Sequence, residues 1–114
     1  FYRNPMVQKM IDYIKTHYQQ DILLQDLADL CGIHTSYAGN LIKAETGETF
    51  SRYLTRLRLE RAEELLQHTE ETVMEIARVI GYNDYFYFAK VFKKHAGMTP
   101  TEYRCRSRKQ ETGG

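Results

Sequence analysis

Apolar side chains recur at helical spacing along almost the whole chain, and no stretch alternates apolar and polar residues over several positions. This pattern predicts an all-α fold with seven helices, organised as two helix-turn-helix subdomains that a long linker helix joins. We expect helices at about residues 5–20, 24–31, 35–46, 50–67, 72–80, 84–95 and from 100 onward.

Residues typical of helix ends mark the boundaries of these segments. Asn4 and Pro5 begin the first helix, Thr72 and Glu75 have the spacing of a capping box, and Thr99 and Glu102 repeat that spacing. Glycines end several of the helices. After Tyr103 an arginine-rich tail follows, which we expect to fray.

The two halves of the chain repeat one another. Leu27, Ala28 and Gly32 correspond to Ile76, Ala77 and Gly81 at an offset of 49 residues, and after one inserted residue the offset becomes 50. Further matches at that offset join a tyrosine, two apolar residues, a lysine and a glycine in each half, namely Tyr37, Leu41, Ile42, Lys43 and Gly47 with Tyr87, Val91, Phe92, Lys93 and Gly97. Agreement at small, apolar and glycine positions together indicates a tandem repeat.

The spacing within each repeat is typical of a helix-turn-helix unit. An alanine in one short helix and a glycine four residues later let the next helix cross closely, as at Ala28 and Gly32. The apolar side of that next helix, with Tyr37, Ala38 and Leu41, then faces inward and its other side stays free. The expected organisation is a first subdomain at residues 5–48, a linker helix at 49–67, a second subdomain at 72–107 and a flexible tail at 108–114.

The composition argues against a membrane protein, a metal protein and an enzyme, and it is compatible with DNA binding without requiring it. Lys and Arg number 16 against 15 Asp and Glu, but basic residues gather between Lys90 and Lys109, which suits a surface that faces phosphates. An ordinary solvated face explains the same charges. No apolar run has the length of a membrane span. Cys31 and Cys105 have no metal-ligand spacing, and no nucleophile with a base or phosphate-cradling loop is present. We therefore expect a cytoplasmic protein that is not an enzyme and holds no cofactor or metal.

A resemblance to a known family rests on two stretches near the C-terminus. Residues 81–94, GYNDYFYFAKVFKK, and residues 97–104, GMTPTEYR, resemble the signature of the AraC/XylS-type regulators. The likeness extends over nearly the whole chain, and it is strongest for the C-terminal output domains of bacterial two-component response regulators. Family membership implies binding to a double-stranded DNA operator in transcription regulation, contact with RNA polymerase, an upstream receiver or effector domain that this chain lacks, and a full-length protein that can be a dimer.

The resemblance also implies which residues meet DNA. The third and sixth helices would enter successive major-groove segments, about one helical turn apart. Base contacts would come from Ser36, Gly39 and Asn40 in the first unit and from Tyr85, Phe86, Ala89 and Lys90 in the second. Phosphate contacts would come from Thr35, Lys43, Lys93 and Lys94.

The chemistry of these side chains suggests what each could read. Asn40 can pair with adenine, Lys90 with guanine, and Phe86 and Ala89 can contact thymine methyl groups. Gly39 has no side chain, so it either lets the backbone approach DNA closely or reflects neutral drift. The rings of Tyr85 and Phe86 have an alternative place, packed back against the linker helix.

Two departures from the family weaken the first unit. Relatives carry Ser or Thr before the second and third helices, where this chain has Leu23 and His34. A lost cap costs about 1 kcal/mol, so we expect the first unit to be the more mobile one. Near-neutral charge and few reading residues in this unit leave one rival function, a helical protein-interaction module that keeps the fold without binding DNA.

Overall fold

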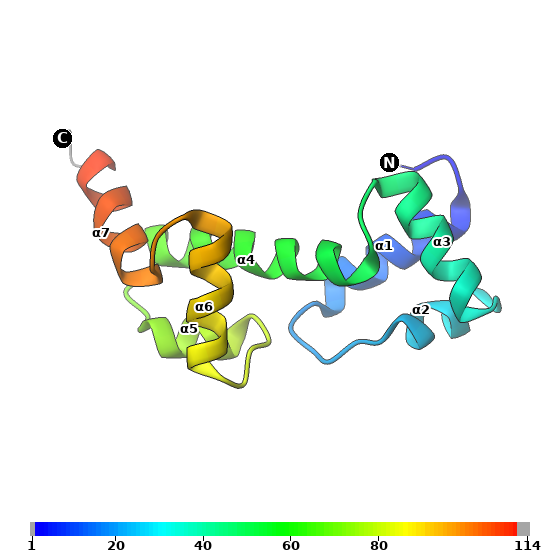
Figure 1. Cartoon of the computed structure of the whole chain (residues 1–114), viewed down its shortest axis with the longest axis horizontal. Helices are drawn as coiled ribbons and strands as arrows, with labels where there is room; N and C mark the ends of the chain where they lie inside the picture. The colour runs from blue at the N-terminus through cyan, green and yellow to red at the C-terminus, as the bar shows by residue number, and fades with distance from the viewer. Residues whose placement is uncertain (1, 112–114) are drawn as a thin grey trace. The chain divides into compact units, whose positions relative to one another are not determined.

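The computed structural model describes residues 2–111, which form seven α-helices and, within that range, no strand. Figure 1 shows the helices in chain order. They are α1 (Pro5–His17), α2 (Leu24–Cys31), α3 (Thr35–Thr46), α4 (Phe50–His68), α5 (Val73–Val79), α6 (Tyr85–Ala96) and α7 (Pro100–Glu111). The predicted all-α class and the seven helices are confirmed.

The chain forms two compact units, residues 1–57 and residues 58–114, and the boundary between them falls inside α4. The linker helix that we expected as a separate segment therefore belongs half to each unit. Tyr53 is buried in the core of the first unit. Further along the same helix, Leu59, Ala62 and Leu66 are buried in the second.

The first unit buries the apolar faces of four helices in one core. Its members come from α1, α2, α3 and the start of α4, where each helix carries its apolar residues three or four positions apart, and from the turn between α1 and α2, which adds Ile22. The buried side chains are Val7, Met10, Ile11, Ile14, Ile22, Leu27, Ala28, Ala38, Ile42 and Tyr53.

Aromatic rings pack against one another in the core of the second unit. Phe88 and Phe92 on α6 are fully buried, and their ring centroids lie 5.8 Å apart. The ring of Tyr103 on α7 meets the ring of Phe92 edge-on, with 5.5 Å between the centroids. Such tilted and edge-on pairs stabilise a core beyond the area that they bury. Burial raises the pKa of the Tyr103 phenol above its ordinary value, and the carboxylate of Glu63 raises it further.

Helix α1 ends earlier than predicted, at His17 rather than near Gln20. The amide of Gln20 donates to the carbonyl of His17 at 2.9 Å, which closes a turn instead of another helical turn. This turn brings Ile22 into the core, where only 6% of the residue is exposed. Burial of one side chain beyond the helix thus decides where the helix ends.

The expected fraying after Tyr103 is wrong, because α7 continues to Glu111. Arg104 donates from Nε to the carbonyl of Leu66 at 3.0 Å, and Arg108 donates to the carbonyl of Thr69 and pairs with Glu70. These bonds tie α7 to the end of α4, so the expected tail begins inside a helix. Residues 112–114 of that tail lie outside the described residues.

The predicted helix caps form to different extents. At the start of α7 the capping box is complete, with Thr99 N donating to Glu102 Oε1 at 2.9 Å and Glu102 N donating to Thr99 Oγ1 at 3.1 Å. At α5 only half of the expected box is present: the amide of Glu75 donates to the Thr72 hydroxyl at 3.1 Å.

The caps that we judged missing from the first unit are partly replaced. His34 accepts a hydrogen bond from the amide of Ser36 on Nδ1 at 3.1 Å, so an imidazole caps α3. Leu23 offers no side-chain acceptor, but the Asp26 carboxylate accepts from the Leu23 amide at 2.7 Å. The first unit therefore lacks less helix-end hydrogen bonding than the sequence indicates. Its greater mobility remains a prediction.

Glycine is required at position 81, in the turn between α5 and α6, for two reasons: the backbone conformation there and the close approach of Arg58. Its φ is +109°, and an added Cβ would lie 2.9 Å from Cζ of Arg58. The same guanidinium stacks over the ring of Tyr82, 5.4 Å from its centroid. Arg58 thus packs against the turn and has a structural role there.

Gly39 lets α3 approach α2 closely. An added Cβ would meet Cδ2 of Leu24 at 3.1 Å, a distance that forces the leucine to move. The tandem offsets place Val73 and Ala89 at the equivalent positions of the second unit, and the two pairs contain the same number of side-chain carbon atoms. The contact with Leu24 thus favours a residue without a side chain at position 39.

Residues 2–111 contain neither a membrane-spanning helix nor a cluster of metal ligands. No helix in this range is long and apolar enough to cross a membrane. Nor do any three histidine, cysteine or acidic side chains in it gather as metal ligands would.

We predict that Gly81→Ala destabilises the chain more than Gly97→Ala does. Alanine at positive φ costs roughly 1–2 kcal/mol at either site, but only at position 81 must it also displace Arg58 from Tyr82, a stacking contact worth about 0.5–1 kcal/mol. Gly97 has φ +79° and open space around it. Urea unfolding measures both, and equal losses would contradict the assigned role of Arg58.

A second prediction concerns acid stability. Bonds from the Thr99 amide and hydroxyl hold the pKa of Glu102 below its ordinary value. The pKa of Glu102 is lower in the folded chain than in the unfolded chain, where it is about 4.5. The ionised carboxylate therefore stabilises the folded chain at pH values above 4.5, and this stabilisation is lost as the pH falls through the pKa of the folded chain. Glu102→Gln should therefore lower stability at pH 7 and much less at pH 3. Glu75→Gln, at the matching helix position, is the control and should show a smaller pH-dependent difference.

A third prediction tests the packing role of Gly39. Gly39→Ala gains roughly 0.5–1 kcal/mol of helix propensity and loses part of it to the contact with Leu24. Adding Leu24→Val, which copies the second unit, should relieve that contact, so the double variant should be more stable than the sum of the single effects by about 0.5 kcal/mol or more. Additive effects in urea unfolding would show that the two residues do not oppose each other.

Candidate nucleic-acid interface

In the first unit, α2 and α3 are joined by a turn that fixes how they cross. Gly32 adopts φ +66°, and the amide of Ile33 donates to the carbonyl of Ala28 at 3.0 Å. This pattern satisfies the last carbonyls of α2 and starts α3 a few residues later. Ala38 and Ile42 then face the core with no exposed surface.

The opposite side of α3 is exposed to solvent. Ser36, Asn40 and Lys43 lie there, four and three residues apart, and therefore share one helical face. Neither Asn40 nor Lys43 has a side-chain hydrogen bond or ion pair with another of the described residues. This face can accept a ligand without breaking an existing contact.

Two predicted contacts of the first unit are placed less favourably. Thr35 is half-buried, and its hydroxyl donates to Oε1 of Gln25, so a phosphate would have to replace that acceptor. Gly39 is also half-buried, and the position of its missing side chain points at Leu24. Only its backbone could approach a base.

In the second unit, α6 begins in a well-defined conformation. The carboxylate of Asp84 accepts from the amides of Phe86 at 2.9 Å and Tyr87 at 3.3 Å. Asp84 is thus the N-cap of α6. Both first-turn amides are satisfied, so the side chains of this turn are presented from a fixed backbone.

The side chain of Phe86 is 81% exposed, and that of Tyr85 is half-buried against it, with the rings edge-on at 5.4 Å. The alternative in which Phe86 packs back on the linker helix is therefore wrong. Further along α6, Lys90, Lys93 and Lys94 are exposed and Ala89 is half-buried. Aromatic surface thus gives way to basic surface along one helix.

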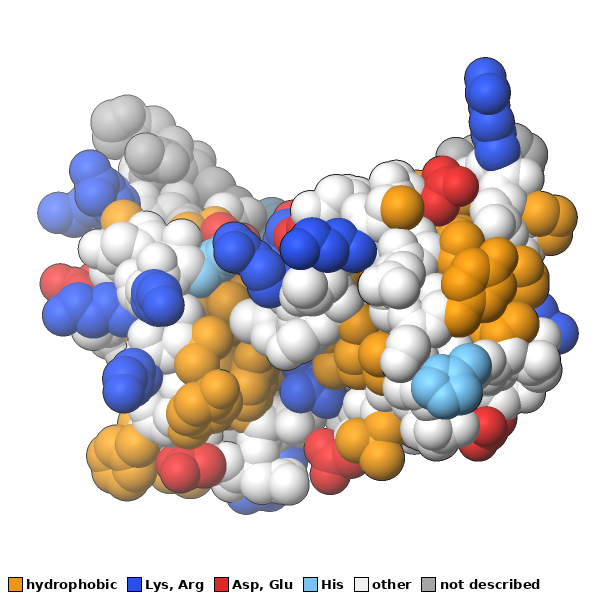
Figure 2. All heavy atoms as spheres, turned by 45° about the vertical axis from the view of Figure 1, so that its right-hand side comes forward, with side chains coloured by type: hydrophobic (Ala, Val, Ile, Leu, Met, Phe, Trp, Pro, Cys, Tyr) orange, Lys and Arg blue, Asp and Glu red, His pale blue; other side chains and the backbone are white. Residues whose placement is uncertain are grey.

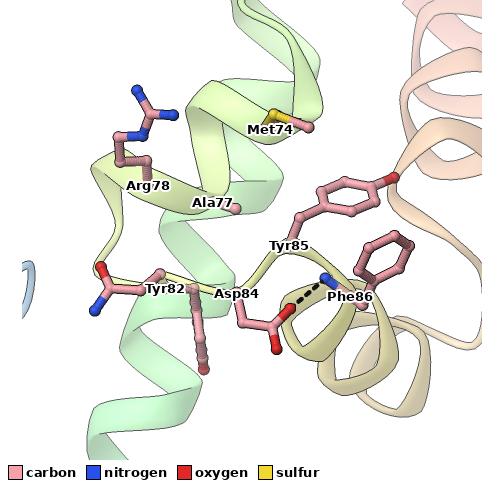
Figure 3. Close-up of a pocket in the computed structure, with 8 residues that line it drawn as sticks. Met74, Ala77, Arg78, Tyr82, Asp84, Tyr85 and Phe86 are labelled. Atoms are coloured by element: carbon pink, nitrogen blue, oxygen red, sulfur yellow. Dashed lines mark hydrogen bonds between the residues drawn. The ribbon is translucent and has the colours of Figure 1, made fainter.

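A hollow of about 370 Å³ lies between α5 and the start of α6. Figure 3 shows Met74 and Tyr85 on one side of it and Arg78 and Tyr82 on the other, with the hydrogen bond from Phe86 to Asp84 drawn as a dashed line below Tyr85. Met74 is not among the residues that the sequence predicts for a site. Its signal is that it falls outside the buried stripe of α5, and 57% of it is exposed.

Tyr37, expected on the inward side of α3, is 49% exposed. The repeat gives it a counterpart in Tyr87, which is 56% exposed and reaches the ring of Tyr82 at 6.0 Å. Each tyrosine precedes a fully buried residue, so the helix turns its ring to the border of the core. Figure 2 shows hydrophobic side chains in orange at the surface of one face, with Lys and Arg side chains in blue on the same face.

Comparison with known proteins places this geometry in a family. The model of the helix-turn-helix domain family matches residues 27–106, most of both units. The chain is 37% identical over 101 residues to the lactose operon transcription activator of Staphylococcus xylosus, which covers 89% of this chain and 36% of the relative. The chain thus spans about a third of that relative's length.

Solved structures agree with this placement. The C-terminal domain of AraT, a response regulator from Geobacillus stearothermophilus, superposes with a TM-score of 0.87 at 38% identity, covering 90% of this chain and 86% of that domain. The DNA-binding domain of AdpA, solved with a target DNA, has a TM-score of 0.89 at 19% identity over 97% of this chain and all of that one, a likeness of fold. The chain belongs to the AraC-type helix-turn-helix family of DNA-binding transcription regulators.

Proposed function

We propose that this chain binds a double-stranded DNA operator with α3 and α6, each in a major-groove segment. One observation carries the proposal: both repeats fix the apolar side of the second helix in a core and leave the equivalent opposite side exposed. Ala38 and Ile42 are buried in one, Phe88 and Phe92 in the other. An α-helix presented in this way fits the major groove. Family membership supports the use of successive groove segments.

The exposed side chains suggest a division of work between contacts. Asn40 can pair bidentately with adenine, Ser36 can bond to several base edges, and Lys90 can donate to guanine. Lys43, Lys93 and Lys94 extend from later turns and would meet phosphates. With three lysines on α6 and one on α3, the second unit would supply more of the affinity.

The partners follow from the family. The similarity to response-regulator output domains supports an upstream receiver or effector domain in the full-length protein, in the bacterial cytoplasm. Regulation would then proceed by contact with RNA polymerase, and a dimer would place two such chains on paired half-sites. The named relatives are regulators, which favours a non-enzymatic role.

Salt dependence and alanine variants test the proposal on duplexes selected from a random-sequence library with this chain. The logarithm of the binding constant should fall linearly with the logarithm of salt concentration, by about 0.9 per phosphate neutralised. Lys90→Ala and Asn40→Ala should each lose about 1–3 kcal/mol of discrimination at one base pair. Lys94→Ala should instead weaken all duplexes alike and reduce the slope by about 1.

The rival function, a protein-interaction module, predicts a different result. In that case no duplex is enriched, or the binding is indifferent to salt and to the lysine substitutions. Thermal unfolding of each variant serves as the control. All three side chains are exposed, so their removal should leave the fold intact.

A further inference from the structure

Phe86 is the most exposed of the large hydrophobic side chains in residues 2–111, at 81%. Burial of an exposed phenyl ring against a partner would be favourable, because it removes apolar surface from water. Large exposed apolar surface of this kind is typical of interaction sites. The ring of Tyr85 contacts it edge-on, and Met74 lines the same hollow between α5 and α6, so further apolar surface lies near the phenyl ring.

The ring is also held in place before any partner arrives. Asp84 fixes the amide of Phe86 at 2.9 Å, and the ring of Tyr85 meets that of Phe86 at an interplanar angle of 76°. An aromatic side chain has few rotatable bonds, and ordering it in advance lowers the entropy lost on binding. Such a ring is suited to contact a partner group of matching shape.

The surroundings favour nucleic acid over protein as the partner. Lys90 lies one helical turn after Phe86 on the same face, and Lys93 follows about one turn later, both exposed. The centre of a protein–protein interface is depleted of charge, whereas a DNA groove offers both apolar and anionic groups. Among base edges of the major groove, the apolar group is the 5-methyl of thymine.

We propose that Phe86, backed by Tyr85 and Met74, selects thymine at one operator position by contact with its 5-methyl group. This inference rests on the proposed DNA binding and adds a specificity-determining residue to it. The equivalent position in the first unit is Ser36, which has no aromatic ring, so this contact has no counterpart there.

The test removes one methyl group at a time from the DNA. With the whole chain and a duplex that it has selected, each thymine is replaced in turn by deoxyuridine and the dissociation constant is measured at fixed salt. At one position the wild-type chain should bind roughly fourfold more weakly, equivalent to about 0.8 kcal/mol for one buried carbon group. Cytosine there should also weaken binding, and 5-methylcytosine should recover part of it.

The protein side of the experiment uses Phe86→Ala, with Val79→Ala as the control because it removes an exposed hydrophobic side chain elsewhere in the same unit. Phe86→Ala should abolish the difference between thymine and deoxyuridine at that position, and Val79→Ala should keep it. Phe86→Leu should keep part of it.

Three results would overturn the inference, each in a distinct way. A deoxyuridine effect that survives in Phe86→Ala places the methyl contact on another residue. Unchanged affinity in Phe86→Ala with no deoxyuridine effect shows that this surface does not touch DNA, as expected for a protein partner. Failure to enrich any duplex removes the proposed function itself.

Discussion

The close crossing of two short helices is the constraint on which each unit depends. It requires a small side chain inside the first helix, and Ala28 and Ala77 are both buried there. It also requires a turn that reverses direction within a few residues, which Gly32 and Gly81 provide at positive φ. Once the crossing is fixed, the inner side of the second helix is committed to the core, and its outer side has to face solvent.

The two units meet this constraint with different side chains. In the first, glycine at position 39 makes room for Leu24 and an imidazole caps the second helix. In the second, an aspartate caps that helix and an arginine fills the space beside the turn. The same architecture thus presents a small polar surface in one unit and an aromatic and basic one in the other.

Periodicity in the sequence was sufficient to predict the helices and their repeat, because each helix carries its own apolar stripe. It could not predict effects that depend on a distant partner. The end of α1 is decided by burial of Ile22, and the length of α7 by carbonyls of α4 that Arg104 and Arg108 reach. Likewise, Tyr37 is exposed and Gly39 faces Leu24 because of how α3 packs on α2, and a helical wheel of α3 alone does not show this packing.

Helix α7 completes the hydrogen bonding of a helix that lies far before it in the sequence. The last carbonyls of any α-helix lack partners within that helix, and for α4 two of the nearby acceptors, Leu66 and Thr69, receive arginine donors from α7. Gln67 adds a bond from α4 to the hydroxyl of Tyr103 at 3.0 Å. The C-terminal segment is consequently part of the folding unit, and ending the chain before Arg104 would leave the carbonyls of Leu66 and Thr69 with only water as a donor in place of the arginines.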